Sequence, residues 1–325
     1  MFFFMKLQYK KPSKITQINM SSACIGLSQK TDFNKLASEK LCELTEHNDC
    51  RFVNSGNSAI FLVMSNVKGS VIVPDQGAWH GFKQIARFLN KDLIIVKTDQ
   101  GLINTSYLDE IVDDLPEGSA LFITSFAAYT AEQDMKGISS YCKAHDILLV
   151  EDASGAISDS EKLLANGEYS DIIVGSTGEP KIINVCDGGF VTTSIPDYFK
   201  DSNLLLKTLK ASNVTVAGIN SEIDSANSNL NRLISSCFYL KHHINDVIYP
   251  DKRGINVIVS CDNPKEVSWK LRDSFDVDGR SIITKCPNYN RLKEKAVAIE
   301  IKNLDVNCLG KSNLDEIISI VNSII

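Results

Sequence analysis

The sequence predicts an open α/β fold, in which a mainly parallel central sheet is flanked by helices. One observation is a series of short apolar runs of Val, Ile, Leu and Phe. Five of them are nearly continuous, as in strands that are covered on both faces. The runs are 70–75, 92–99, 120–126, 146–154 and 171–177, with a sixth strand expected at 189–194. The other observation is helical periodicity between the runs, because alternating strands and helices are typical of a parallel sheet.

Helices are expected on both sides of these strands. The segments with helical periodicity are 58–67, 81–90, 106–115 and 134–146. After about residue 200 the pattern changes, and two further helices are expected at 202–214 and 224–246, the second long enough to link two domains.

A small α+β domain is expected at the C-terminal end. Its predicted elements are a strand at 254–261, a helix at 264–275, a strand at 295–304 and a closing helix at 312–324 with Ser312 as its N-cap. We therefore expect an N-terminal segment, a large domain, linking helices and a small domain. Their bounds are 1–40, 41–200, 201–245 and 246–325.

Composition excludes several classes of function. The chain has 325 residues, of which 43% are hydrophobic, so it can bury a full core. A net charge of −6 without a basic block argues against nucleic acid as a partner. No apolar run approaches the roughly 18 residues of a membrane-spanning helix. The five histidines have no metal-ligand spacing, so no metal site is expected.

The cysteines and the first residues indicate a cytoplasmic protein. Nine cysteines are scattered without a C-x-x-C pair, as in proteins that keep reduced thiols. The start, MFFFMKLQYKK, has no positive region ahead of its apolar residues and too few of them for a signal peptide.

Candidate site residues follow the apolar runs, because ligands of open α/β sheets bind beyond the carboxyl ends of the strands. Ser55, Gly56, Asn57 and Ser58 stand just before an apolar helix, where backbone N–H groups and the helix dipole favour an anion. Taken alone, the segment fits an ordinary Ser/Asn helix cap better than an anion site. They do not match the Walker pattern of P-loop proteins.

Two charged residues stand at or shortly after the ends of the fourth and fifth predicted strands. Asp152 closes the run ILLVED and is a candidate partner for a cationic ligand group, or else a helix cap. Lys181 follows Ser176 by five residues and precedes Gly188 by seven. At the edge of a sheet, burial is expected to lower its pKa and free the amine as a nucleophile, whereas most loop lysines are simply solvated.

Aromatic residues follow the first strand of the series. Trp79 and His80 in the segment VPDQGAWHGF offer rings that can cover a flat cofactor. A tryptophan packed under its own helix is the alternative.

Together these residues form the set that pyridoxal 5′-phosphate requires. A lysine forms the Schiff base, an aspartate keeps the pyridine nitrogen protonated, and a cradle binds the phosphate. No single member of the set is as informative as their appearance in chain order at successive strand ends.

On these residues the sequence resembles the fold type I pyridoxal-phosphate enzymes, specifically the DegT/DnrJ/StrS family of sugar aminotransferases. NSGNSAIFLVM is similar to the family's phosphate turn, and VIVPDQGAW to its strand that ends in Val-Pro. LLVEDASGA is similar to its Glu-Asp-Ala-Ala-Gln segment, and GSTGEPKIINVCDGGFVTT to its Ser-Phe-x-x-x-Lys…Gly-Gly segment. The resemblance covers roughly residues 40–195.

The resemblance implies a role for each matching residue. The phosphate would be bound by Gly56, Asn57, Ser58 and Ser176. Asp152 would bind the pyridine nitrogen, and Lys181 would be the Schiff-base lysine. The family's fold implies a three-layer arrangement and a site built across a homodimer interface.

Three positions depart from the family. Gly155 stands where the family has a glutamine that approaches the phenolic oxygen of the cofactor. Ala78 stands at the usual aromatic position, so stacking is expected from Trp79 or His80. Asn220 is the sole counterpart of the Asn-Tyr-Arg segment that reaches the neighbouring subunit's site.

The leading interpretation is an aminotransferase in which Lys181 moves the proton after an amino donor has displaced it. The family implies glutamate as donor and a keto-sugar or another small carbonyl compound as acceptor. One alternative is a lyase, a dehydratase or a cysteine desulfurase that uses Cys186, five residues after Lys181. Another is a degenerate relative that serves as a scaffold.

Overall fold

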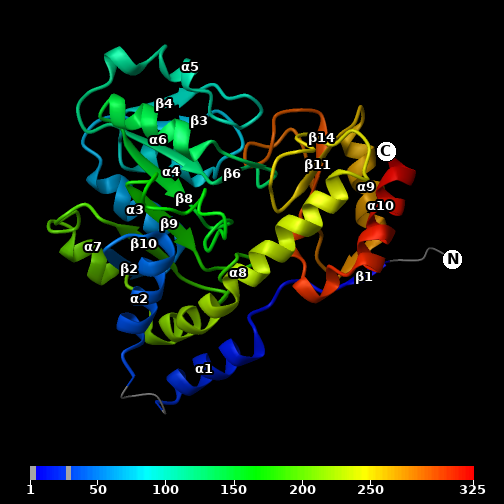
Figure 1. Cartoon of the computed structure of the whole chain (residues 1–325), viewed down its shortest axis with the longest axis horizontal. Coiled ribbons are helices and arrows are strands. Elements are labelled where there is room, and N and C mark those ends of the chain that lie inside the picture. The colour runs from blue at the N-terminus through cyan, green and yellow to red at the C-terminus, as the bar shows by residue number, and fades with distance from the viewer. Residues whose placement is uncertain (1–4, 27–30) are drawn as a thin grey trace.

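The computed structural model describes residues 5–26 and 31–325 and shows two bodies joined by one long helix (Figure 1). The larger body holds the central sheet, and the smaller one is formed mainly by the C-terminal part of the chain. Within the described residues, no helix is long and apolar enough to cross a membrane. The expected absence of a signal peptide rests partly on residues 1–4, which lie outside the described ranges.

A seven-stranded sheet forms the centre of the larger body. Its strands in chain order are β2 (Asp49–Val53), β3 (Val71–Pro74), β4 (Leu93–Val96), β5 (Ala120–Thr124), β8 (Leu148–Asp152), β9 (Ile172–Ser176) and β10 (Gly189–Thr193). The spatial order is β2-β10-β9-β8-β5-β3-β4, and only β10 runs antiparallel to its two neighbours. The mainly parallel sheet is therefore confirmed, and all six predicted strands are present.

Two features of the sheet differ from the prediction. The strand β4 is not covered on both faces, because it lies at the edge of the sheet and leaves Ile95 47% exposed. The strand β2 was not predicted, because its sequence DCRFV mixes charged and apolar residues and lacks an apolar run. It pairs antiparallel with β10, so its carboxyl end meets the same sheet edge as those of β3, β5, β8 and β9.

Helices cover both faces of this sheet, which confirms the predicted three layers. On one face α3 (Gly56–Asn66) and α4 (Gly81–Phe88) bury Val63 and Phe82. On the other face α2 (Phe33–Thr45), α6 (Met135–Ala144) and α8 (Asn213–Lys241) bury Leu41, Ile138 and Leu230. Burial of this apolar surface is the main term that stabilises the layers.

Three of the predicted helices have different bounds in the structure. In place of one helix at 106–115 the chain forms α5 (Thr105–Leu108) and a 3-10 turn at Val112–Asp114. The predicted helix 202–214 is also wrong, since α7 covers only Asn203–Thr208. The Ser212 side chain accepts a hydrogen bond from the Thr215 N–H and starts α8, well before the predicted position 224.

The smaller body contains a three-stranded antiparallel sheet with the order β11-β14-β13. Its strands are β11 (Val257–Ser260), β13 (Ile283–Lys285) and β14 (Ala296–Ile299), and its helices are α9 (Pro264–Ser274) and α10 (Lys311–Ile324). The predicted N-cap at Ser312 is wrong, because α10 begins one residue earlier and its N-cap is Gly310. The α+β character of this part is confirmed.

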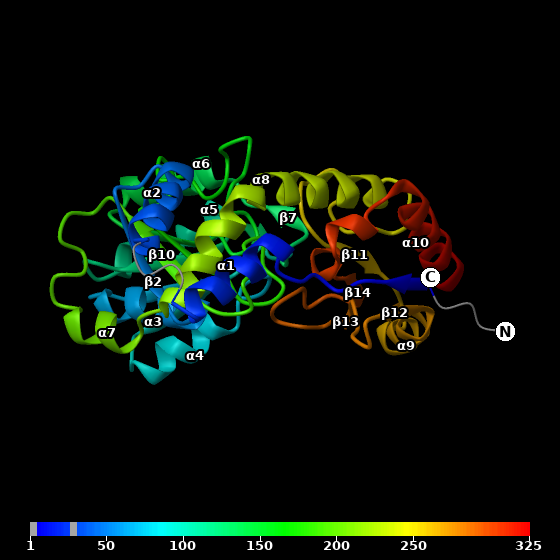
Figure 2. The ribbon, with the colours of Figure 1, turned by 90° about the horizontal axis from the view of Figure 1, so that it is seen from below.

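The N-terminal segment contacts both bodies (Figure 2). Its strand β1 (Met5–Leu7) pairs in parallel with β12 (Phe275–Val277) of the smaller body. Its helix α1 (Lys14–Cys24) packs along α8. The predicted domain bounds stay a prediction.

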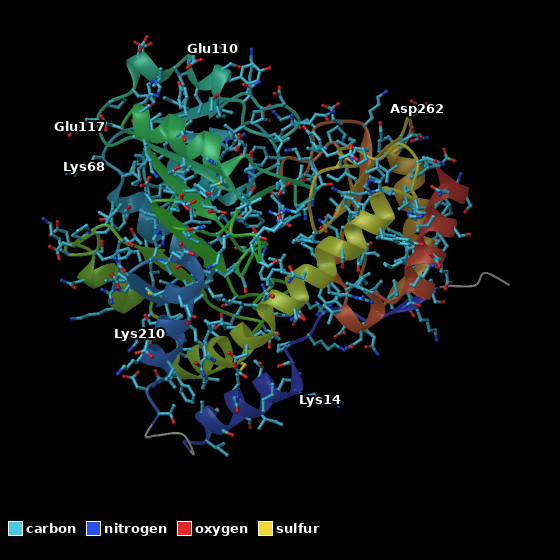
Figure 3. The ribbon with its side chains drawn as sticks, in the orientation of Figure 1. Lys14, Lys68, Glu110, Glu117, Lys210 and Asp262 are labelled. Carbon is cyan, nitrogen blue, oxygen red and sulfur yellow. The ribbon has the colours of Figure 1, made fainter. Side chains whose placement is uncertain are left out.

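Charged side chains such as Lys68, Glu110 and Asp262 point outward from the periphery of the molecule (Figure 3).

Candidate active site

A cavity of about 370 Å³ opens at the carboxyl edge of the large sheet and reaches the smaller body. This size is within the usual range for a small-molecule or cofactor site. The polar and aromatic residues that line it are Ser55, Asn57, Trp79, Tyr129, Asp152, Ser154, Ser176, Glu179, Lys181, Asn290, Arg291 and Lys302. Gly56 and Gly175 also line it.

One end of the cavity is a cradle built by close backbone approach. A Cβ atom on Gly56 would lie 2.5 Å from the Ser176 Cβ, and one on Gly189 would lie 2.8 Å from the Gly56 nitrogen. Glycine at these two positions therefore lets the start of α3 touch the ends of β9 and β10. The first N–H groups of a helix have no partner inside it, so this end of α3, with Ser176 beside it, suits an anion.

Ser58 does not line the cavity, although it was a predicted phosphate contact. Its hydroxyl donates to the Asn54 Oδ1 atom at 2.5 Å and lies 2.8 Å from the Ser55 Oγ atom. Its N–H donates to the same Ser55 oxygen at 3.1 Å. Ser58 thus completes the cap of α3, which is the alternative that the sequence left open.

Glu151 and Asp152 point to opposite faces of β8, as successive residues of a strand do. Glu151 is fully buried and accepts hydrogen bonds from Ser125 Oγ at 2.6 Å, Ser170 Oγ at 2.6 Å and Ala165 N at 2.9 Å. Burial raises its pKa, and these hydrogen bonds oppose the rise. Asp152 lines the cavity, which makes it the carboxylate of the pair that a ligand can reach.

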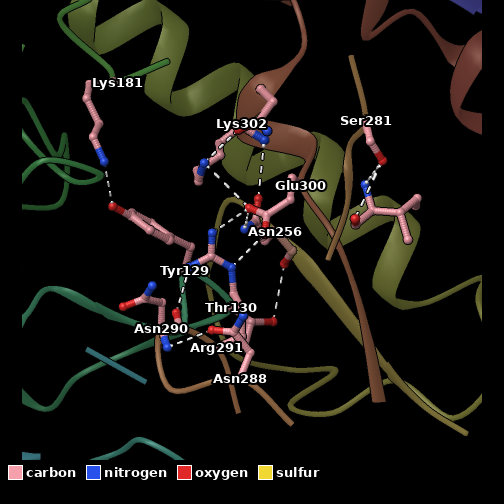
Figure 4. A network of polar contacts seen from close by, with 12 residues as sticks. Tyr129, Thr130, Lys181, Asn256, Ser281, Asn288, Asn290, Arg291, Glu300 and Lys302 are labelled. Atoms are coloured by element: carbon pink, nitrogen blue, oxygen red, sulfur yellow. Dashed lines mark hydrogen bonds and ion pairs between the residues drawn. The ribbon is translucent and has the colours of Figure 1, made fainter. Parts of the chain in front are cut away.

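Lys181 extends into the same cavity, where its Nζ donates to the Tyr129 hydroxyl at 3.0 Å (Figure 4). Burial lowers the pKa of Lys181, but Tyr129 and Asp152 raise it, and the net direction is upward. The expectation of a lowered pKa is therefore wrong, because it rested on burial alone and Tyr129 and Asp152 outweigh the effect of burial. The structure does bring the lysine, the aspartate and the anion cradle into one cavity.

The aromatic candidates are separated by the structure. Trp79 lines the cavity, is 38% exposed and donates from its Nε1 to the Asn57 Oδ1 atom at 2.8 Å. His80 does not line it, since its ring packs edge-on against Tyr289 with centroids 5.3 Å apart. Asn220 lies on α8 and is also absent from the lining.

Six polar or aromatic cavity residues were missed by the sequence analysis, namely Tyr129, Ser154, Glu179, Asn290, Arg291 and Lys302. A signal for Tyr129 was present, because it follows the strand β5 just as Asp152 ends β8. Ser154 and Glu179 lie beside the predicted Asp152 and Lys181 in the larger body. Asn290, Arg291 and Lys302 come from the smaller body, where no strand-end argument applied.

Arg291, Glu300 and Lys302 form a charged cluster behind the cavity (Figure 4). The Glu300 carboxylate accepts from Arg291 Nε at 2.6 Å and from Arg291 Nη2 at 2.8 Å, and Lys302 Nζ lies 3.5 Å away. Burial would raise the pKa of Glu300, but the two cations lower it to about 2. Burial, Arg291 and Lys181 lower the pKa of Lys302 to about 7 against the effect of Glu300. One carboxylate thus faces two cations that reach the cavity.

The cysteines give no support to a thiol mechanism. All nine lie in the described part of the chain, and none lines the cavity. Cys186 is exposed, and partial burial of its thiol raises its pKa above the ordinary value. A nucleophilic cysteine requires the opposite shift.

The donor set fits a flat phosphorylated aldehyde with a ring nitrogen. The cradle suits the phosphate, Asp152 suits a protonated nitrogen, and the Lys181 amine suits the aldehyde. The exposed ring of Trp79 is available to cover one face. These requirements were inferred from the sequence, and the residues that meet them lie in one cavity.

Two family models match the sequence. The DegT/DnrJ/EryC1/StrS aminotransferase family matches residues 17–237, which is more than half of the chain. A model described as the MJ1341 family C-terminal domain matches residues 227–322. No curated protein sequence matches.

Several solved structures are similar over nearly the whole chain. 3-Amino-5-hydroxybenzoic acid synthase has a TM-score of 0.76 at 11% identity, covering 99% of this chain and 98% of its own. Serine palmitoyltransferase of Sphingomonas wittichii has a TM-score of 0.74 at 13% identity, covering 98% and 86%. The SepCysS–SepCysE N-terminal domain complex has 0.73 at 13%, covering 99% and 95%. At such identities the likeness shows the fold, which confirms the predicted fold type I architecture.

Proposed function

The chain belongs to the DegT/DnrJ/EryC1/StrS aminotransferase family, and from this premise we propose that it is a pyridoxal-phosphate-dependent aminotransferase. The observation that supports the proposal is that Lys181, Asp152 and the Gly56–Ser176 cradle line one cavity. They come from the ends of three strands, β2, β8 and β9, and chance seldom brings an amine, a carboxylate and an anion site together.

The large-body residues would hold the cofactor. Gly56, Asn57 and Ser176 bind its phosphate, Asp152 binds the pyridine nitrogen, and Trp79 covers the ring. Bound pyridoxal phosphate supplies a ring that takes up the electron pair released at the substrate carbon. The Asp152 carboxylate favours this uptake because its negative charge keeps the ring nitrogen protonated.

Lys181 would have two tasks. Its amine holds the cofactor covalently at rest, and after an amino donor displaces it, the free amine moves a proton between two carbon atoms. A proton can be accepted only by the neutral amine, so the groups that raise the pKa of Lys181 have to be offset at that stage.

The wall opposite the cofactor cradle favours an acidic substrate. Arg291 and Lys302 reach the cavity and share the single carboxylate of Glu300, so the carboxylate of an amino donor would be attracted to this pair of cations. Glutamate, the donor implied by the family, carries two carboxylates. The acceptor would be a keto-sugar or another small carbonyl compound that fits a cavity of about 370 Å³.

The same proposal includes a cytoplasmic homodimer. Free thiols at all nine cysteines support a reducing compartment. Exposed Ile15 and Ile18 on α1, at 57% and 59%, support a contact between subunits at the N-terminal helix. Light scattering should give twice the mass of one chain, and the mass of a monomer would contradict this part of the proposal.

The decisive experiment is reductive trapping combined with an amino-transfer assay. Purified protein mixed with pyridoxal phosphate should turn yellow, and borohydride should fix the cofactor on Lys181 as read by peptide mass. Lys181→Ala should abolish trapping and activity, whereas Lys68→Ala, which removes an exposed lysine far from the cavity, should change neither. Beyond one equivalent per site, glutamate should be converted to 2-oxoglutarate only with a carbonyl acceptor, because the acceptor must take up the amino group before another turnover.

Other results would overturn the proposal. Trapping on a different lysine, or none, would contradict the assignment of the site. Sulfide or alanine produced from cysteine, without amino transfer, would favour the desulfurase alternative. A cofactor bound but inert towards all amino donors would favour the scaffold.

A further inference from the structure

Tyr129 reaches the cavity through an uncommon backbone conformation. Ala128 and Tyr129 have φ angles of 52° and 63°, in the left-handed region that residues other than glycine rarely adopt. The conformation is fixed from the smaller body, because the Tyr129 carbonyl accepts from Ile255 N at 2.8 Å and from Asn256 N at 2.9 Å. Strain of this kind is retained only where the surroundings determine it, and such sites are often functional.

The ring of Tyr129 lies among the three cations of the cavity. The Lys181 Nζ, Lys302 Nζ and Arg291 Cζ atoms lie 5.3, 5.0 and 5.1 Å from its centroid. Its hydroxyl meets the Lys181 Nζ at 3.0 Å, so the strained turn delivers one hydrogen-bonding group to the amine (Figure 4).

Gly155 is the residue that makes room for this ring. A Cβ atom on Gly155 would lie 2.7 Å from the Tyr129 Cε1 atom and 2.9 Å from its Cδ1 atom. Contacts this short do not occur, so no other side chain fits at position 155 while Tyr129 keeps its place. A larger side chain at position 155 and the Tyr129 ring in its present place are therefore mutually exclusive.

We propose that Tyr129 is a further catalytic residue of this site, which holds the reacting amine of Lys181, and that Gly155 leaves the space that its ring occupies. The inference rests on the proposed role of Lys181. A phenol hydroxyl accepts a hydrogen bond from an ammonium group and donates one to a neutral amine. Tyr129 can therefore keep the amine in position in both of its charge states, while the proton is moved.

Tyr129→Phe removes only the hydroxyl and is the first test. In cofactor-free protein the labelling rate of Lys181 by acetic anhydride, followed by peptide mass against pH, reports the pKa of the amine. Because Tyr129 raises that pKa, the variant should shift the midpoint down by roughly one unit and speed labelling at pH 8 about tenfold. In loaded protein the pH midpoint of the cofactor's absorption change should also move. Tyr198→Phe, which removes a hydroxyl bonded to the Val63 carbonyl away from the cavity, should move neither.

Gly155→Ala tests the steric half of the proposal. Its methyl group should displace the ring and reproduce both shifts, and the double variant with Tyr129→Phe should show no further shift. If Tyr129→Phe leaves both midpoints at their wild-type values, the proposal is wrong, whether or not Gly155→Ala folds. Midpoints that stay at their wild-type values in Gly155→Ala alone would overturn the steric half.

The two proposals fail in different ways. Absence of trapping on Lys181 in the wild-type protein would overturn the proposed function, and with it the role of Tyr129. Normal trapping with unchanged midpoints in the Tyr129 variant would overturn the role of Tyr129 alone.

Discussion

The cavity has two walls that are built in different ways. The sheet wall comes from strand ends and adjacent turns of the larger body and consists of Gly56, Asn57, Asp152, Ser176 and Lys181. The cation wall comes from a strained turn and from loops of the smaller body and consists of Tyr129, Asn290, Arg291 and Lys302. The sheet fixes the first wall, whereas contacts between distant parts of the chain fix the second.

This difference in construction suggests a difference in role. The sheet wall offers the anion cradle, the carboxylate and the amine, which are the groups that a cofactor of the family needs. The cation wall offers excess positive charge, which suits a substrate. Variants of the sheet wall should therefore alter the bound cofactor. Variants of the cation wall should alter substrate KM while the cofactor spectrum stays unchanged, except at Tyr129, which contacts the Lys181 amine.

The largest effect is expected from Asp152→Asn in the sheet wall. The amide cannot hold a proton on the ring nitrogen, so kcat should fall about 10²–10³-fold. The absorption spectrum of the loaded protein should change as well. Glu151→Gln is the matched control, because this neighbouring carboxylate points away from the cavity into hydrogen bonds with Ser125 and Ser170.

The control should separate stability from chemistry. Glu151→Gln replaces an acceptor with a donor inside a buried network, so the free energy of unfolding should fall by about 1–3 kcal/mol. Its cofactor spectrum and kcat should stay near wild type. If Asp152→Asn and Glu151→Gln lose activity equally, Asp152 has no role in the chemistry that Glu151 lacks, and its assignment to the cofactor is wrong.

The sheet wall could be predicted from the sequence because its signals are local. Asp152 and Ser176 each end a run of buried apolar residues, and a parallel sheet brings the ends of such runs to one edge. Lys181 could be added by its spacing from Ser176. The same logic applies to Tyr129, which follows β5 in the turn AAYT.

The cation wall could not be predicted, because no local pattern sets Arg291 or Lys302 apart from other charged residues. Arg291 lies in the loop between β13 and β14, and Lys302 in a 3-10 turn after β14. Their place beside Lys181 depends on contacts between the bodies, such as the hydrogen bond from Gly77 N to Tyr289 O at 2.9 Å and that from His80 N to Asn290 Oδ1 at 2.6 Å. Contacts between residues so far apart in the chain produce no periodic pattern in the sequence from which they could be predicted.

A smaller effect is expected from Arg291→Lys in the cation wall. Lysine cannot reproduce the two parallel bonds to Glu300, so the charge presented to the substrate moves. The loss of one charged hydrogen bond should raise KM for glutamate about 30-fold, with kcat and the cofactor spectrum little changed.

Arg253→Lys is the matched control for Arg291. Arg253 is buried to a similar degree and binds Asp159 through Nη1 at 2.9 Å and Nη2 at 3.2 Å, but it does not line the cavity. The variant Arg253→Lys should lower the melting temperature of the protein without changing KM for glutamate. An equal rise of KM in both variants would mean that Arg291 acts through stability and not through the substrate.

The smallest effect is a pH dependence that belongs to the cation wall alone. Since the pKa of Lys302 is about 7, its charge is present below pH 7 and lost as the pH rises through that value. KM for an anionic donor should therefore rise several-fold between about pH 6 and 8, because a neutral amine no longer attracts the carboxylate. Lys302→Met should abolish this slope, leaving KM at all pH values near the wild-type value above pH 8. Lys83→Met should preserve it, because Lys83, whose pKa is about 8, lies outside the cavity. A slope that survives in Lys302→Met would assign the titration to another group and remove Lys302 from the substrate wall.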